Sequence, residues 1–245
     1  MRNGECGLMN VAYGRRRLPL LVLTSWLSFS TSCRTLPAPA PGEMARVANA
    51  CEAALPLEYE ARQTLVFEVK PRWWWPTIRM TALGYAQVNR KTGDYAVVCL
   101  SPVGMKVFDA VRTNGQDRVR LAFPTASAKA QEVERAIGAD LGVLYSKLAP
   151  APGTVVRRGG DRWEFCERHG DSVTRYEFRG TPLRLVMKDV SSPAGRTVLT
   201  FGDYREAAGR TYPALVTLTN RRHGYKLTIR THDFAAFGGK IGDLK

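Results

Sequence analysis

The chain has 245 residues, 44% of them hydrophobic, and a formal net charge of +14. This hydrophobic content is ample for a sizeable core. After the first thirty residues no stretch approaches 18 uninterrupted apolar residues, which excludes a further membrane span. The basic residues are dispersed, as in Arg118/Arg120 and Arg221/Arg222, which is typical of a solvated strand face rather than of a nucleic-acid site. A preference for anionic lipid headgroups is the alternative interpretation of this charge.

An export signal is predicted at the N-terminus. Arg15-Arg16-Arg17 precedes an apolar run over 18–29 that is too short for a spanning helix of roughly 20 residues but fits a secretory signal. Small residues then lead to Cys33. This arrangement resembles a bacterial lipoprotein signal peptide, in which the cysteine receives the lipid and becomes the first mature residue. Ser30 stands where such signals usually carry Leu, so ordinary cleavage without lipid is the alternative.

Three parts are therefore expected along the chain: a signal peptide over 1–32, a lipid-attached cysteine with a Pro/Ala tether over 33–42, and one domain over 43–245. A short amphipathic helix is predicted over 43–54, before Pro56. Within the domain the cysteines are Cys51, Cys99 and Cys166, an odd number without CxxC or metal-ligand spacing. One disulfide with one free thiol and three buried thiols both remain open.

Alternating apolar residues and short turn signals predict a long antiparallel meander. Asn114-Gly115 is one of these turn signals. One long amphipathic helix, over 126–148, interrupts the meander. About eleven strands are expected, at 65–69, 78–89, 95–100, 105–112, 118–123, 163–167, 173–178, 183–190, 197–204, 212–219 and 225–231. A sheet this long must curl, and the long helix can then cover its concave face. The predicted fold class is α+β, an open half-barrel with a short N-terminal helix and a lid helix.

Two stretches, 99–124 and 201–231, resemble the LolA/LolB lipoprotein-carrier superfamily, which includes small uncharacterised bacterial outer-membrane lipoproteins of that fold. The first is a double hairpin, and the second has a "DYR" step, a turn, "YP" and two closing strands. The resemblance implies binding of acyl chains in an apolar cavity and handover at the outer membrane, without cofactor or catalysis. Arg34, which follows Cys33, implies outer-membrane delivery, because retention in the inner membrane is associated with Asp at that place. A protein without lipid would instead be soluble in the periplasm.

Lys70-Pro-Arg-Trp73-Trp74-Trp75-Pro76 is the most unusual local feature. The flanking prolines predict a loop rather than a strand. Indoles favour the membrane interface, so Trp73–Trp75 are expected either to enter a bilayer or to guard the cavity mouth. In the alternative interpretation the loop folds back and its indoles fill the concave core.

No catalytic or metal motif is present: the three histidines lack ligand spacing, and no GxSxG, Walker or GxGxxG sequence occurs. A non-enzymatic lipoprotein is therefore expected, a monomer without cofactor. Its acyl lipid (a palmitate chain, for example) or lipidated client would occupy the cavity. The alternative is a structural or accessory envelope lipoprotein whose cavity is filled by its own side chains. The expected cavity residues, besides Trp73, Trp74 and Trp75 at the mouth, are Leu65, Phe67, Val69, Met80, Val97, Val107 and Leu121.

Overall fold

The computed structural model describes residues 49, 58–70, 76–121, 128–146, 148–151, 154–193, 195–207 and 209–237. All of them lie in one compact unit, Leu36–Lys245. The signal segment, Cys33, Cys51, Trp73–Trp75 and all of the expected N-terminal helix except Asn49 lie outside these residues. Asn49 itself is helical.

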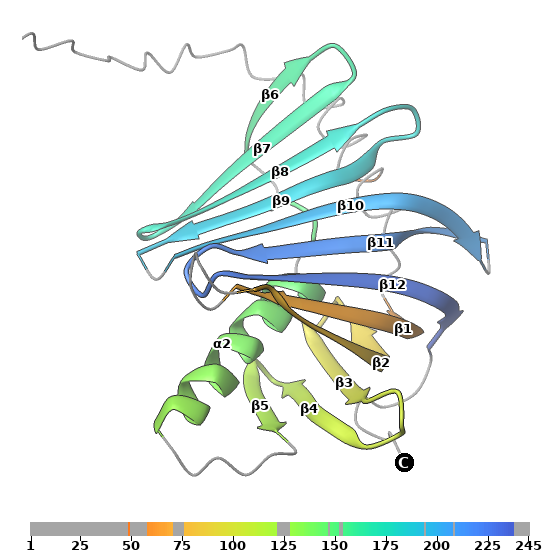
Figure 1. Ribbon diagram of the computed structural model, residues 1–245. Helices are drawn as coiled ribbons and strands as arrows, with labels where there is room; N and C mark the ends of the chain where they lie inside the picture. The colour runs from red at the N-terminus through yellow and green to blue at the C-terminus, as the bar shows by residue number, and fades with distance from the viewer. Residues whose placement is uncertain are drawn as a thin grey trace, which may run out of the picture. The chain divides into compact units, whose positions relative to one another are not determined.

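The described strands form one antiparallel sheet that does not close (Figure 1). Its order is β5-β4-β3-β2-β1-β12-β11-β10-β9-β8-β7-β6, so two meanders meet where β1 pairs with β12. The bounds in chain order are β1 Glu58–Val69, β2 Ile78–Asn89, β3 Asp94–Leu100, β4 Lys106–Thr113, β5 Gln116–Leu121, β6 Val155–Gly159, β7 Arg162–His169, β8 Ser172–Arg179, β9 Arg184–Ser192, β10 Gly195–Ala207, β11 Arg210–Asn220 and β12 Tyr225–Ala236.

The short turns follow from residues that accept a left-handed backbone. Asn114 and Gly115 have φ values of 52° and 77°, as a two-residue turn between β4 and β5 requires. Gly93 has a φ of 77° in the turn between β2 and β3. These local connections build each meander, which confirms the predicted hairpins.

The helix α2, Ala128–Tyr145, connects β5 at one edge of the sheet with β6 at the other. It contacts β5, and two glycines allow this close approach. A Cβ added to Gly138 would lie 3.3 Å from Cγ2 of Val119, and one added to Gly142 would lie 2.7 Å from Nη1 of Arg112. These glycines therefore let α2 pack closely against β4 and β5, at one edge of the sheet.

The predicted architecture is confirmed in outline and corrected in detail. The sheet has twelve strands rather than about eleven, because β6 was missed. Only two apolar residues, Val155 and Val156, precede the Arg157-Arg158 pair, so this short edge strand gives no clear alternation. Helix α2 is also shorter than the predicted 126–148, since its described part ends at Tyr145.

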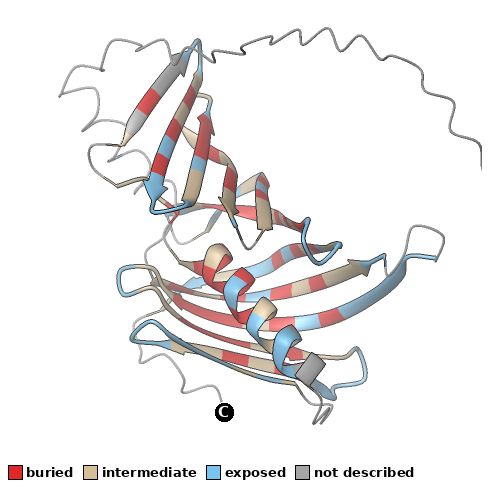
Figure 2. Cartoon of the chain, turned by 90° about the vertical axis from the view of Figure 1, so that its left-hand side faces the viewer, coloured by how far each residue is buried: buried red, intermediate tan, exposed pale blue. Residues whose placement is uncertain are grey.

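The core lies between α2 and one face of the sheet, called here the inner face. Buried and exposed residues alternate along most strands, as Figure 2 shows, so each strand contributes every second side chain to this core. From α2 and the residues after it come the buried side chains of Leu141, Leu144, Tyr145 and Leu148. From the sheet come, among others, Leu65, Val97, Cys99, Phe108, Phe178, Leu185, Leu199, Leu218 and Ile229.

Candidate functional site

The strand register aligns six of the expected cavity residues on the inner face: Leu65, Phe67, Val69, Met80, Val97 and Leu121. Leu65 pairs with Ala82 and Ile229, and Phe67 pairs with Met80 and Leu227. Directly opposite residues of antiparallel strands share a face. Leu65 and Val97 are fully buried, whereas Phe67 and Leu121 are half-buried against the core. The expectation that Val107 faces inward is corrected. Its neighbour Phe108 is aligned with Cys99 and Leu121 on the inner face, so the half-buried Val107 points to the other face.

The apolar residues near the β1–β2 turn are more exposed than those at the centre. Val69, which pairs with Ile78, is 36% exposed, Ile78 is 56% exposed and Met80 is 43% exposed. The register places the β3–β4 turn at the same end of the sheet, where Val103 and Met105 are exposed. These five residues are called the apolar end. In the sequence Trp73–Trp75 stand between β1 and β2, outside the described residues.

Asp140 of α2 holds the helix to the other meander. Its buried carboxylate accepts hydrogen bonds from Oγ1 of Thr197 at 3.0 Å, from Nδ2 of Asn220 at 2.7 Å and from the hydroxyl of Tyr225. Burial, and then the carboxylate of Asp140, raises the pKa of Tyr225, so its hydroxyl stays a donor. Residues from β10, β11 and β12 thereby meet one side chain of α2, which we call the Asp140 clamp.

Three further polar contacts join α2 to β9, β1 and β3. Nζ of Lys188 on β9 donates to the carbonyl of Val143 at 2.9 Å, and the Tyr145 hydroxyl donates to Oε1 of Gln63 at 3.0 Å. The hydroxyl of Tyr95 lies 3.2 Å from the carbonyl oxygen of Gly138. Burial raises the pKa of Tyr145, which keeps this phenol neutral beneath the helix.

Two hollows of different size lie between the described part of α2 and the sheet. A cavity of about 30 Å³ lies among Gln63, Arg90, Tyr145 and neighbouring aromatic residues, enough for one or two water molecules. A larger cleft of about 370 Å³ separates part of α2 from β9, β10 and β11, and its walls are both polar and apolar. Helix α2 therefore packs tightly at β5 but leaves a gap on the side that the Asp140 clamp bridges.

Sequence reasoning missed two members of this site, Asp140 and Arg90. Asp140 follows Ile137 by three positions and precedes Leu144 by four, so a helical projection places it on the apolar face of α2. An acidic residue at such a position is a signal for a buried polar partner. Arg90 gave no such signal, because it precedes a predicted turn in a chain rich in arginine.

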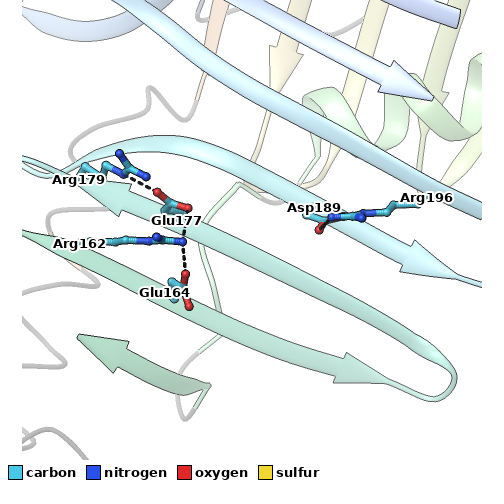
Figure 3. Close-up of polar contacts among 6 residues, drawn as sticks. All are labelled: Arg162, Glu164, Glu177, Arg179, Asp189 and Arg196. Carbon is cyan, nitrogen blue, oxygen red and sulfur yellow. Dashed lines mark hydrogen bonds and ion pairs between the residues drawn. The ribbon is translucent and has the colours of Figure 1, made fainter. Parts of the chain in front are cut away.

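Charged residues on the face opposite the core pair with one another along β7 to β10 (Figure 3). Glu177 accepts from Arg162 at 2.9 Å and from Arg179, while Arg196 forms a two-pronged contact with Asp189 at 2.9 Å and 2.7 Å. Such forked guanidinium–carboxylate pairs fix geometry as well as charge. Some of the arginines of the chain therefore neutralise carboxylates of the same sheet.

Among the described residues, no group of three or more His, Cys, Asp or Glu side chains is placed to hold a metal ion. In that same part of the chain, no helix is long and apolar enough to cross a membrane. Cys99 is buried and Cys166 is exposed, and both are free thiols. Burial raises the pKa of Cys99 to about 12.

No family model and no curated protein matches the chain. Solved structures are similar to it, and three of them are described here. A LolA superfamily protein from Nitrosomonas europaea is 10% identical with a TM-score of 0.49, over 80% of this chain and 94% of that one. A DUF1329 family protein from Desulfovibrio piger is 10% identical with a TM-score of 0.47, over 81% and 92%. A domain described as an outer membrane lipoprotein-sorting protein, from Vibrio parahaemolyticus, is 12% identical with a TM-score of 0.39, over 82% and 94%.

Proposed function

We propose that this chain is an exported lipoprotein that binds an acyl chain, free or attached to a lipidated client, between α2 and the inner face of the sheet. Cys33 is its lipid anchor, and the domain faces the periplasm from the outer membrane as a carrier or receiver. One observation carries the proposal: in the described part of the chain, helix α2 packs over a broad apolar sheet face and contacts both meanders. Each CH₂ group transferred from water contributes about 0.8 kcal/mol, so one acyl chain is a sufficient ligand.

We infer that α2 moves when this surface binds an acyl chain, because the cavity of about 30 Å³ beside Tyr145 is too small to hold one. The cleft beside β9, β10 and β11 marks the side on which the helix separates. On the opposite side Gly138 and Gly142 keep α2 against β5 and β4. We infer that α2 turns about its β5 contact when the Asp140 clamp releases.

The apolar end supports contact with a bilayer. Three of its residues, Ile78, Val103 and Met105, are more than half exposed at one end of the sheet. Exposed apolar clusters of this kind mark interaction surfaces, and Trp73–Trp75 stand between β1 and β2 in the sequence. A lipid-anchored domain would then meet the membrane with this end.

The small volume of the cavity beside Tyr145, about 30 Å³, also favours a second function, that of a structural envelope lipoprotein whose concavity is permanently filled by α2. Lipid extraction and mass spectrometry of the chain purified without added lipid distinguish the two. Co-purified acyl lipid in near-stoichiometric amount supports the binding function. A chain that is free of lipid and binds no added fluorescent fatty acid supports the structural function and contradicts our proposal.

A further inference from the structure

At the end of β2, the guanidinium of Arg90 is buried without enough acceptors. Its Nη2 donates to the hydroxyl of Tyr59 at 3.3 Å, and its Cζ lies 5.1 Å from the centre of the Tyr59 ring. Nε and Nη1 are buried and have no hydrogen-bond partner. A cation that loses its hydration without gaining acceptors is costly, and an anion in contact with it removes that cost.

The described residues around Arg90 supply no such anion. The carboxylate of Glu58, which is aligned with the neighbouring Asn89, is engaged by Nδ2 of Asn89 at 3.2 Å and by Nζ of Lys91 at 3.7 Å. The aromatic rings of Tyr59, Phe234 and Tyr212 stack in succession beside Arg90, with centroid separations of 5.1 Å and 4.4 Å. This part of the site therefore combines one cation with aromatic walls.

Arg90 also lines the cavity of about 30 Å³, together with Gln63, Tyr145 and Thr231. A cavity of this volume admits a small polar group but not a chain of methylene groups. Polar side chains on its wall are already connected: Gln63 accepts from Tyr145 at 3.0 Å and donates to Thr231 at 3.4 Å. The donors without acceptors on this wall are those of Arg90.

We propose that Arg90 binds the oxyanion head of the acyl ligand, either the carboxylate of a free fatty acid or the phosphate of a lipid headgroup. The inference rests on the proposed acyl-binding function and adds the polar end of the ligand to it. The small cavity is the part of this oxyanion-binding site that remains when α2 lies against the sheet.

The position of Arg90 also orients the ligand. Arg90 follows the last residue of β2, whereas the exposed apolar residues Ile78 and Met80 lie at its beginning. Twelve strand residues span about 40 Å, so the two groups lie at opposite ends of one strand. An amphiphile drawn from a bilayer at the apolar end keeps its membrane orientation, with its tail toward the bilayer and its head at Arg90.

Competition against a fluorescent fatty acid tests the proposal on the full purified chain. Two matched pairs of competitors serve as probes: palmitic acid with the corresponding alcohol, and monoacylglycerol phosphate with monoacylglycerol. We expect at least one charged member to bind tenfold or more tightly than its neutral counterpart. A preference in the first pair alone identifies a fatty acid, and a preference in the second alone identifies a phosphate headgroup.

The variant Arg90→Met should abolish this preference while leaving the affinity for the neutral members within about threefold. Arg162→Met, which changes an arginine on the face opposite the core, is the matched control and should keep the preference. Equal binding of charged and neutral members by the unaltered chain overturns the Arg90 site alone, as does a preference that persists in Arg90→Met. Failure of the chain to bind any probe, the fluorescent one included, overturns the acyl-binding function and the Arg90 site together.

Discussion

The carboxylate of Asp140 on α2 accepts a hydrogen bond of 2.7 Å from the side-chain amide of Asn220 on β11. The two residues lie 80 positions apart in the chain, and both are buried. This contact joins the helix to the meander that follows it, on the side where a cleft already separates the two. The Asp140 clamp is therefore the contact that an opening of α2 must break.

Replacing Asp140 by Ala should lower the free energy of unfolding by about 1–3 kcal/mol, because the buried amide of Asn220 and the half-buried hydroxyls of Thr197 and Tyr225 lose their acceptor. Urea denaturation measures this change. Glu132→Ala alters an exposed carboxylate on the same helix and should stay within about 0.5 kcal/mol. Equal stability of the two variants would mean that the clamp contributes nothing.

Cys99 should report the opening of α2 through its reactivity. The thiolate is the reactive form, and burial raises the pKa of Cys99 to about 12, so at pH 8 this thiol is both neutral and shielded. We expect a thiol reagent to modify the exposed Cys166 rapidly and Cys99 slowly, as read by peptide mass spectrometry. Asp140→Ala should accelerate the modification of Cys99 severalfold without changing that of Cys166. Rapid modification of Cys99 in the unaltered chain would contradict a closed helix.

Gly84 should resist substitution although it lies within a strand. A Cβ at this position would lie 2.2 Å from Cδ1 of the buried Leu65, so Gly84→Ala should cost about 1–3 kcal/mol of the free energy of unfolding. A Cβ added to Gly202 on β10 would have no other atom within 4 Å. Gly202→Ala is therefore the control and should be neutral or stabilising by up to about 1 kcal/mol. Thermal melting of both variants compares them, and an unchanged melting temperature for Gly84→Ala would refute the tight inner packing.

Replacing Trp73, Trp74 and Trp75 together by Ser should reduce binding of the chain to lipid vesicles, because indoles favour the membrane interface. Vesicle co-sedimentation measures this loss, and circular dichroism checks that folding is unchanged. If the substitutions unfold the domain instead, the indoles belong to the core and the membrane interpretation of the loop is wrong.

The sequence predicted the parts of this fold that depend on local rules. Asn114-Gly115 predicted a two-residue turn, and the alternation after Ile78 predicted β2, since side chains of a strand point to opposite faces in turn. The pairing of β1 with β12 and the crossing of α2 join residues far apart in the chain, and no local rule determines them.

The site was predicted less completely for the same reason. Leu65 and Val97 were identified as inward residues because burial follows strand period. The side chains that contact Asp140 and Arg90 lie more than 25 positions away from them in the chain. Hydrophobic periodicity cannot identify such partners, because it describes which face a residue occupies and not what it meets there.

Locking α2 to the sheet tests the central claim, that an acyl chain binds beneath a movable helix. Asp140→Cys and Thr197→Cys place two thiols where side-chain oxygens now lie 3.0 Å apart, and a short thiol-to-thiol reagent can bridge them. Binding of a fluorescent fatty acid is then measured before and after bridging. Our account predicts that the unbridged variant binds the probe and the bridged variant does not. Undiminished binding after bridging, or no binding by either form or by the unaltered chain, would contradict it.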